Sequence, residues 1–189
     1  MKKILFLSLL FVFCFALNAY AVPPYKIDDS ASKDLNAPSP VLKRTDKILI
    51  VLPEDGQYGD KVYPGSGSLT ADRLYVALSK RANDVTVSDT DMTMEEAKAY
   101  ARKNNFTHII YPEITNWEER LTSVSGRRSN LSIHVTVFDV SNNKMVHDAI
   151  LYGYGPSSWT VGVVGQKSMD SLLDKPAVAY ATLLFTGNK

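Results

Sequence analysis

Residues 48–52 read Ile48-Leu49-Ile50-Val51-Leu52, five consecutive apolar residues that would leave a β-strand with no polar face. Most of them are β-branched, which favours extended backbone, and Pro53 ends the run. A strand that is apolar on both sides is typical of a sheet covered by helices on both faces. The sequence therefore predicts a buried central strand at this point.

Segments after this strand show alternating helical and strand periods. The spacing of Leu69, Leu74 and Leu78 predicts a helix over 69–81, and Thr93 with Glu96 forms a capping box that opens a second helix. The other expected elements are strands at 85–87 and 108–117, a hairpin at 130–140 and 145–154, and a helix at 169–185 that contains Pro176. The order β-α-β-α-β-β-β-α predicts an α/β (α+β) fold in which helices pack on a mixed β-sheet.

The first 21 residues have the features of a cleavable signal peptide. Lys2 and Lys3 precede an apolar run, and Ala19-Tyr20-Ala21 matches the small-x-small site after which signal peptidase cuts. We therefore expect a mature chain that begins at Val22 and lies in the periplasm. The lone cysteine, Cys14, follows the bulky Phe13, so there is no lipobox, and the sequence does not support a lipid anchor in the membrane.

The predicted mature chain divides into a leader and one domain. Residues 22–46 are rich in proline, serine and charge without a helical or strand period, and we interpret them as a flexible leader. Residues 47–189 then form a single domain. Loss of Lys2 and Lys3 with the signal lowers the basic count from 21 to 19 against 20 acidic residues, which leaves a net charge of −1. This balance argues against nucleic acid as a partner.

No pattern in the chain predicts catalysis, a cofactor or a metal. The glycine-bearing loop at 53–67 joins a strand to a helix, but it lacks the complete phosphate-binding and dinucleotide motifs. We interpret it as a mobile connection in which Ser68 or Thr70 caps the helix. Asp89 and Asp91 lack the other oxygen ligands of a calcium loop. The three histidines have no ligand spacing, and we expect them to pack beside aromatic residues in strands.

Two segments carry candidate partner-binding residues. The segment that starts with Trp117, at the end of the 108–117 strand, and leads to the next strand contains Trp117, Arg120, Arg127 and Arg128. Tryptophan and arginine often anchor protein interfaces. The glycine-rich loop at 153–167 contains the second tryptophan, Trp159. The alternative for both tryptophans is burial in the core, where large aromatic residues are common.

Part of the chain resembles an uncharacterised family of bacterial envelope lipoproteins. The likeness rests on the Trp-Glu-Glu-Arg stretch at 117–120 and on the Asp-Val-x-x-x-Lys-Met-Val stretch at 139–146, and it extends over residues 47–185. More distantly, the chain is similar to the envelope domain of the TolB N-terminal region, CsgG and LpoB. This resemblance implies an α/β sandwich that binds proteins and brings no catalytic residues. Family members are usually lipid-anchored, which leaves association with the outer membrane open.

These observations predict a non-enzymatic periplasmic accessory protein that binds another component of the cell envelope, most simply a protein. One alternative is a subunit that assembles with itself or within a secretion complex, in line with the resemblance to CsgG. The other is an envelope hydrolase that would use the 53–67 loop, although no nucleophile with a nearby base is visible in the sequence. The oligomeric state is left open.

Overall fold

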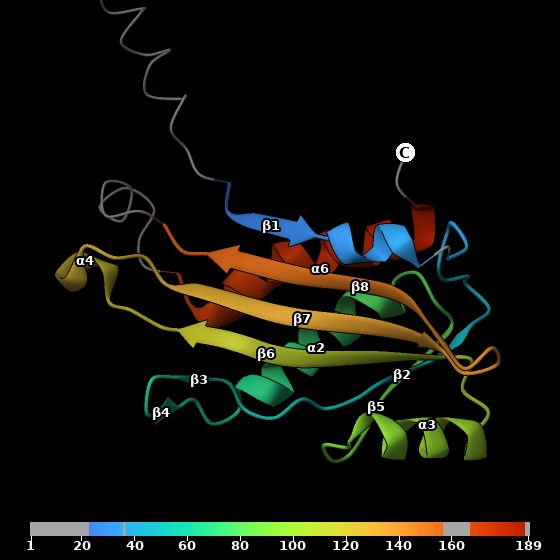
Figure 1. Cartoon of the computed structure of the whole chain (residues 1–189). Helices are drawn as coiled ribbons and strands as arrows, with labels where there is room; N and C mark the ends of the chain where they lie inside the picture. The colour runs from blue at the N-terminus through green and yellow to red at the C-terminus, as the bar shows by residue number, and fades with distance from the viewer. Residues whose placement is uncertain (1–22, 36, 157–166, 188–189) are drawn as a thin grey trace, which may run out of the picture.

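The computed structural model describes residues 23–35, 37–156 and 167–187. Its main sheet has six strands in the order β1-β8-β7-β6-β2-β5 (Figure 1). The strands are β1 Tyr25–Asp28, β2 Lys47–Ile50, β5 Asp84–Val87, β6 His108–Glu118, β7 Asn130–Asp139 and β8 Lys144–Tyr154. A small hairpin of β3 Gln57–Tyr58 and β4 Lys61–Val62 lies apart from this sheet. The sheet is mixed, because β2 runs parallel to β5 and β6 whereas β6, β7, β8 and β1 are antiparallel.

The apolar run at 48–52 begins in an interior strand, as predicted. Ile48 and Ile50 belong to the larger hydrophobic cluster on one face of the sheet, and Leu49 and Val51 belong to a smaller cluster on the other face. All four side chains are buried. The two clusters explain why this strand has no polar side.

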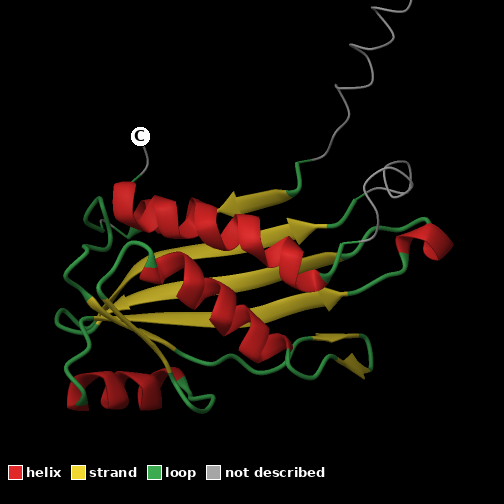
Figure 2. Ribbon diagram, turned by 180° about the vertical axis from the view of Figure 1, so that it is seen from behind, coloured by secondary structure: helices red, strands yellow, loops and turns green. Residues whose placement is uncertain are grey.

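Helices cover the two faces unequally. The helices α2 Ser66–Ser79 and α6 Met169–Thr186 pack side by side on one face, as Figure 2 shows. The helix α3 Met94–Lys103 covers the smaller cluster on the other face, and its capping box between Thr93 and Glu96 forms as predicted. The predicted fold class and the order of the main elements are confirmed. No helix in the described part of the chain is both long and apolar enough to cross a membrane.

The prediction of a flexible leader at 22–46 is wrong for the described residues of that segment. Strand β1 pairs with β8 and forms one edge of the main sheet. A 3-10 helix, η1 Ser30–Asp34, follows it, and the Ser32 hydroxyl hydrogen-bonds the backbone N–H and C=O of Asp148 in β8. Leu42 is 1% exposed, and its N–H donates to the carbonyl of Leu184 in α6. The ordered domain therefore begins near Tyr25, because this segment pairs with the edge of β8 and contacts α6.

Helix α6 continues through Pro176. Proline has no N–H to donate to the carbonyl of Leu172 four residues earlier. This carbonyl lies against β8 at Gly153, where an added Cβ would be only 2.5 Å from the Leu172 oxygen. Gly153 therefore allows the helix to approach the sheet closely at the turn in which Pro176 leaves the Leu172 carbonyl without its helical hydrogen bond.

Candidate functional site

The candidate site lies on the face of the sheet opposite α2 and α6. There, no helix of the described part of the chain lies over β1, β8, β7 and much of β6 (Figure 1). Residues of β7 alternate between the large core cluster and this open face, and the core side consists of Leu131, Ile133, Val135 and Val137. The other side of β7 carries Asn130, Ser132, His134 and Thr136. An antiparallel sheet with one packed face leaves its polar face available to a ligand or partner.

A three-strand polar network lies at the centre of the open face. His134 on β7 hydrogen-bonds Asp148 on β8 through Nε2 (2.8 Å) and Glu113 on β6 through Nδ1 (3.2 Å). Desolvation lowers the pKa of His134, but the hydrogen bonds and negative charges of Asp148 and Glu113 outweigh it, so the pKa is raised above its usual value. The imidazole thus joins three strands on one surface.

Replacement of His134 by glutamine is expected to destabilise the protein more at pH 5.5 than at pH 8.5. A raised folded-state pKa means that the stabilising contribution is complete below the unfolded-state pKa of about 6.5 and is lost as pH rises through the folded value. Urea unfolding of both proteins at the two pH values measures this difference. An equal loss at both pH values would show that the charge of His134 does not stabilise the network.

The other histidine of the hairpin has a different environment. His147 is buried on the opposite face, where its ring packs edge-on against Tyr180 of α6 at a centroid distance of 5.5 Å. Desolvation is the main reason that the pKa of His147 is lowered. The prediction that strand histidines pack beside aromatic residues thus holds for His147, whereas His134 lies between two carboxylates.

One end of the open face is aromatic and basic. The rings of Tyr152 and Tyr154 on β8 are stacked, with centroids 6.2 Å apart. Lys26 of β1 lies over Tyr152, and the Arg128 guanidinium lies 4.6 Å from the Tyr154 centroid. These side chains are half-buried or exposed, so this end of the sheet presents aromatic surface beside positive charge.

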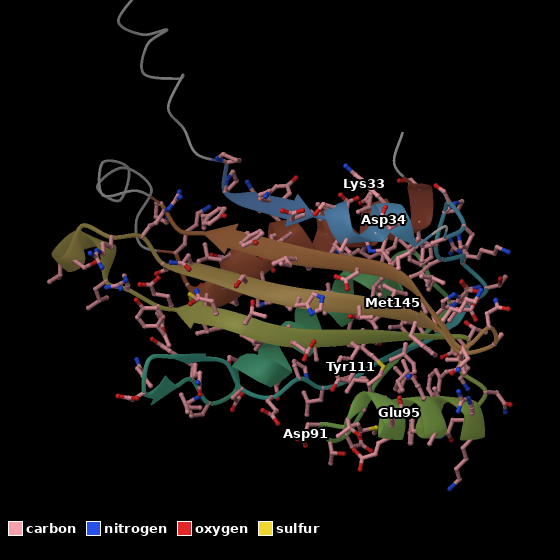
Figure 3. All side chains as sticks on the ribbon, viewed as in Figure 1. Lys33, Asp34, Asp91, Glu95, Tyr111 and Met145 are labelled. Carbon is pink, nitrogen blue, oxygen red and sulfur yellow. The ribbon has the colours of Figure 1, made fainter. Side chains whose placement is uncertain are left out.

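An acidic cleft borders the other side of the open face. It has a volume of about 580 Å³ and lies at the carboxyl end of β2, between β6 and the start of α3. Since β2 connects through α2 to β5 and then through α3 to β6 on its other side, this is the switch point at which ligands bind in open α/β sheets. The residues that line the cleft include Glu54, Asp55, Met92, Glu96, Glu113 and Ile114, together with Asp91 and Tyr111, which Figure 3 labels.

The pKa of Tyr111 shows the effect of the carboxylates around this cleft. Its hydroxyl donates to the carbonyl of Met92 at 3.0 Å. Burial is the main cause that raises the pKa of Tyr111, and the carboxylates of Glu113, Glu54, Asp91 and Glu96 raise it further. Among the described residues that line the cleft, none is lysine or arginine. The cleft is therefore suited to positively charged groups.

The 53–67 loop is built as a helix cap. Its Asp55 carboxylate accepts hydrogen bonds from the backbone N–H groups of Gly65 (3.0 Å) and Gly67 (2.8 Å) at the start of α2. A carboxylate of the protein thus occupies the position where a phosphate would bind. The prediction that Ser68 or Thr70 caps a mobile connection is wrong, because Asp55 provides the cap and fixes the loop.

The structure separates the predicted partner-binding residues. Trp117 is only 3% exposed and lies in the large core cluster, so it is not available as a surface anchor. Arg120 forms an ion pair with Glu118 and donates to the Tyr58 hydroxyl at 3.0 Å. Arg127 is exposed and Arg128 is half-buried, both on the same connection as Arg120. Trp159 lies outside the described residues.

Neither the polar network nor the cleft was predicted from the sequence. Each brings together side chains from strands and loops that are far apart in the chain, and only the sheet register places them side by side. Within the described ranges, no group of three or more histidine, cysteine, aspartate or glutamate side chains has an arrangement that could hold a metal ion. The arrangement can form hydrogen bonds, ion pairs and aromatic contacts with a partner.

A family model described as "Domain of unknown function (DUF4823)" matches residues 41–184. The chain belongs to this family. No curated protein matches the chain. The DUF4823 match covers the strands β2 to β8 and nearly all of α6, but not β1. It agrees with the expected membership of an uncharacterised bacterial family.

Solved structures with a similar fold include a PelC dodecamer from Paraburkholderia phytofirmans. It is 15% identical to this chain with a TM-score of 0.58, and the match covers 87% of this chain and 98% of that one. A variant PelC dodecamer from the same organism is 16% identical to this chain with a TM-score of 0.60, and the match covers 86% of this chain and 97% of that one. Lipoprotein GNA1162 from Neisseria meningitidis is 13% identical to this chain with a TM-score of 0.47, and the match covers 74% of this chain and 97% of that one. These findings do not confirm the more distant resemblance to TolB, CsgG and LpoB.

Proposed function

We propose that this protein is a non-enzymatic accessory protein of the bacterial periplasm and that it binds another component of the cell envelope, most simply a protein, through the open face of its sheet. The observation that carries the proposal is the open face itself. Its strands are fixed from behind by α2 and α6, while the other side offers stacked tyrosines, amides, hydroxyls and the His134 network. Such a rigid surface can bind a partner without moving.

Two further features support the proposal. The signal-like sequence at 1–21 favours export to the periplasm. The glycine loop, the segment that an envelope hydrolase would use, is occupied by the internal cap of Asp55. Tyrosine is a preferred contact residue at protein interfaces, because its ring buries much apolar area while its hydroxyl stays polar.

A photo-crosslinking residue at Thr115, on the open face, is expected to capture an envelope protein in living cells. Thr115 is exposed, and its hydroxyl contacts Ser132 across the β6–β7 pair. The matched control is the same residue at Ser79, which is exposed at the end of α2 on the covered side. The Thr115 product should decrease when Tyr152 is replaced by alanine. Equal products at Thr115 and Ser79, or a product unaffected by Tyr152→Ala, would contradict the proposed site.

Self-assembly is a second candidate, because the similar PelC structures are dodecamers. The likeness extends over nearly the whole length of the PelC chain and most of this one. We therefore propose that copies of this protein associate with one another and that the assembled form binds the partner. Light scattering of the chain that begins at Val22 tests this directly, since an assembly has a mass several times that of one protomer.

A further inference from the structure

The connection between β6 and β7 presents apolar and basic side chains to solvent. It includes the short helix α4 Thr122–Ser125 and projects beyond the end of the sheet (Figure 1). Leu121 is 68% exposed and Val124 is 83% exposed, the two highest values among the large apolar side chains that are exposed in the described part of the chain. Arg127 is also exposed on this connection. Two exposed apolar side chains beside an exposed arginine are typical of a contact surface rather than of a solvated turn.

The acidic cleft has the complementary character. Glu54 and Asp91 are exposed, and no hydrogen bond or ion pair to the described residues engages either carboxylate. Met92 and Ile114, which are half-buried, add apolar surface to the same cleft. The cleft can therefore accept both parts of the connection, since its carboxylates match arginine and its apolar residues match Leu121 and Val124.

We infer that the cleft of one copy binds the β6–β7 connection of the next copy. This inference rests on the proposed self-assembly and names its interface. The connection projects from one end of the sheet, whereas the cleft lies beside α3 (Figures 1 and 3), so the two surfaces are different parts of the molecule. A contact between two different surfaces joins the copies head to tail. Each copy is then rotated by the same angle relative to the one before it, and the copies form a ring when the last one meets the first.

The charges of the connection favour a protein cleft over a lipid surface as its occupant. Glu119 lies beside Arg120, and Arg120 is already paired with Glu118, so the connection is only weakly basic. Binding to anionic lipid requires several basic residues near the membrane. In contrast, the exposed carboxylates of Glu54 and Asp91 in the cleft can be paired by only a few positive groups.

A charge exchange between the two surfaces tests the inference. One variant of the chain that begins at Val22 carries Val124→Glu and Arg127→Glu on the connection, and the other carries Glu54→Lys and Asp91→Lys in the cleft. Each variant alone is expected to lose the assembly and to scatter light as a single protomer. An equal mixture should regain the assembled mass, because every contact between the two variants then pairs opposite charges. The recovery also shows that both variants are folded.

The controls lie on η1, across the open face from Asp91, as the labels of Figure 3 show. Lys33 and Asp34 are exposed there, and Lys33→Glu and Asp34→Lys should leave the assembled mass unchanged. A wild-type chain that scatters as one protomer would overturn the self-assembly and the interface together. An assembled wild type whose two variants keep their mass, or do not recover in the mixture, would overturn only the interface. Binding to phosphatidylglycerol vesicles that Arg127→Glu abolishes, with the assembly intact, would assign the connection to lipid instead.

Discussion

A chain that begins at Thr45 is expected to lose most of its stability relative to one that begins at Val22. The deletion removes β1, which pairs with β8 over four residues, and exposes the edge of that strand. It also removes Leu42, whose side chain is buried beneath α6. The loss of a buried leucine side chain alone costs about 2–5 kcal/mol, a large part of the roughly 5–15 kcal/mol that stabilises a small domain.

Thermal melts followed by circular dichroism measure this effect. The single variant Leu42→Ala in the chain that begins at Val22 serves as the intermediate case, and it should lie between the two melting temperatures. A synthetic peptide of residues 23–44 added to the shortened chain should raise its melting temperature. A shortened chain that melts at the same temperature as the longer one would show that the segment does not pack on the domain.

Replacement of Trp117 by alanine is expected to lower the free energy of unfolding by about 3–5 kcal/mol, the range for truncation of a large buried aromatic side chain. Trp117 pairs with Leu131 across β6 and β7 and lies in the core cluster. Its Cβ would be 2.8 Å from a Cβ added at Gly56, so the loop before β3 packs tightly against it. Denaturant unfolding at constant pH measures the change.

Arg127→Ala is the matched control, because Arg127 lies on the connection that follows β6 and is exposed. Its free energy of unfolding should stay within about 0.5 kcal/mol of the wild type. Similar losses for the two variants would indicate that Trp117 does not lie in the core.

Most of the secondary structure could be predicted because it is encoded by local periods. The apolar alternation at 130–140 and 145–154 predicts a hairpin, and the structure has β7 and β8 at 130–139 and 144–154. The capping box at Thr93 places the start of α3 to the residue, since its hydrogen bonds join residues three apart. These signals need no information from the rest of the chain.

The candidate site could be predicted only in part. The arginines after β6 predict an exposed connection, and the structure places Arg127 at the surface and Arg128 partly exposed. Their role in binding a partner stays a prediction. The polar network was missed, because Glu113, His134 and Asp148 meet only when β6, β7 and β8 pair in one particular register. A shift of one residue would turn each side chain to the opposite face.

The interior strand at 48–52, the helices and the hairpin are encoded locally, because each depends on a repeat of apolar residues or on a cap within one turn. The burial of Trp117 and the order of residues 25–35 and 37–42 follow from the three-dimensional fold. Both depend on contacts between segments that are far apart in the chain, and no local pattern encodes such contacts. Strand β1 has too few apolar residues to fold alone, and it is ordered because β8, about 125 residues later, provides its hydrogen bonds.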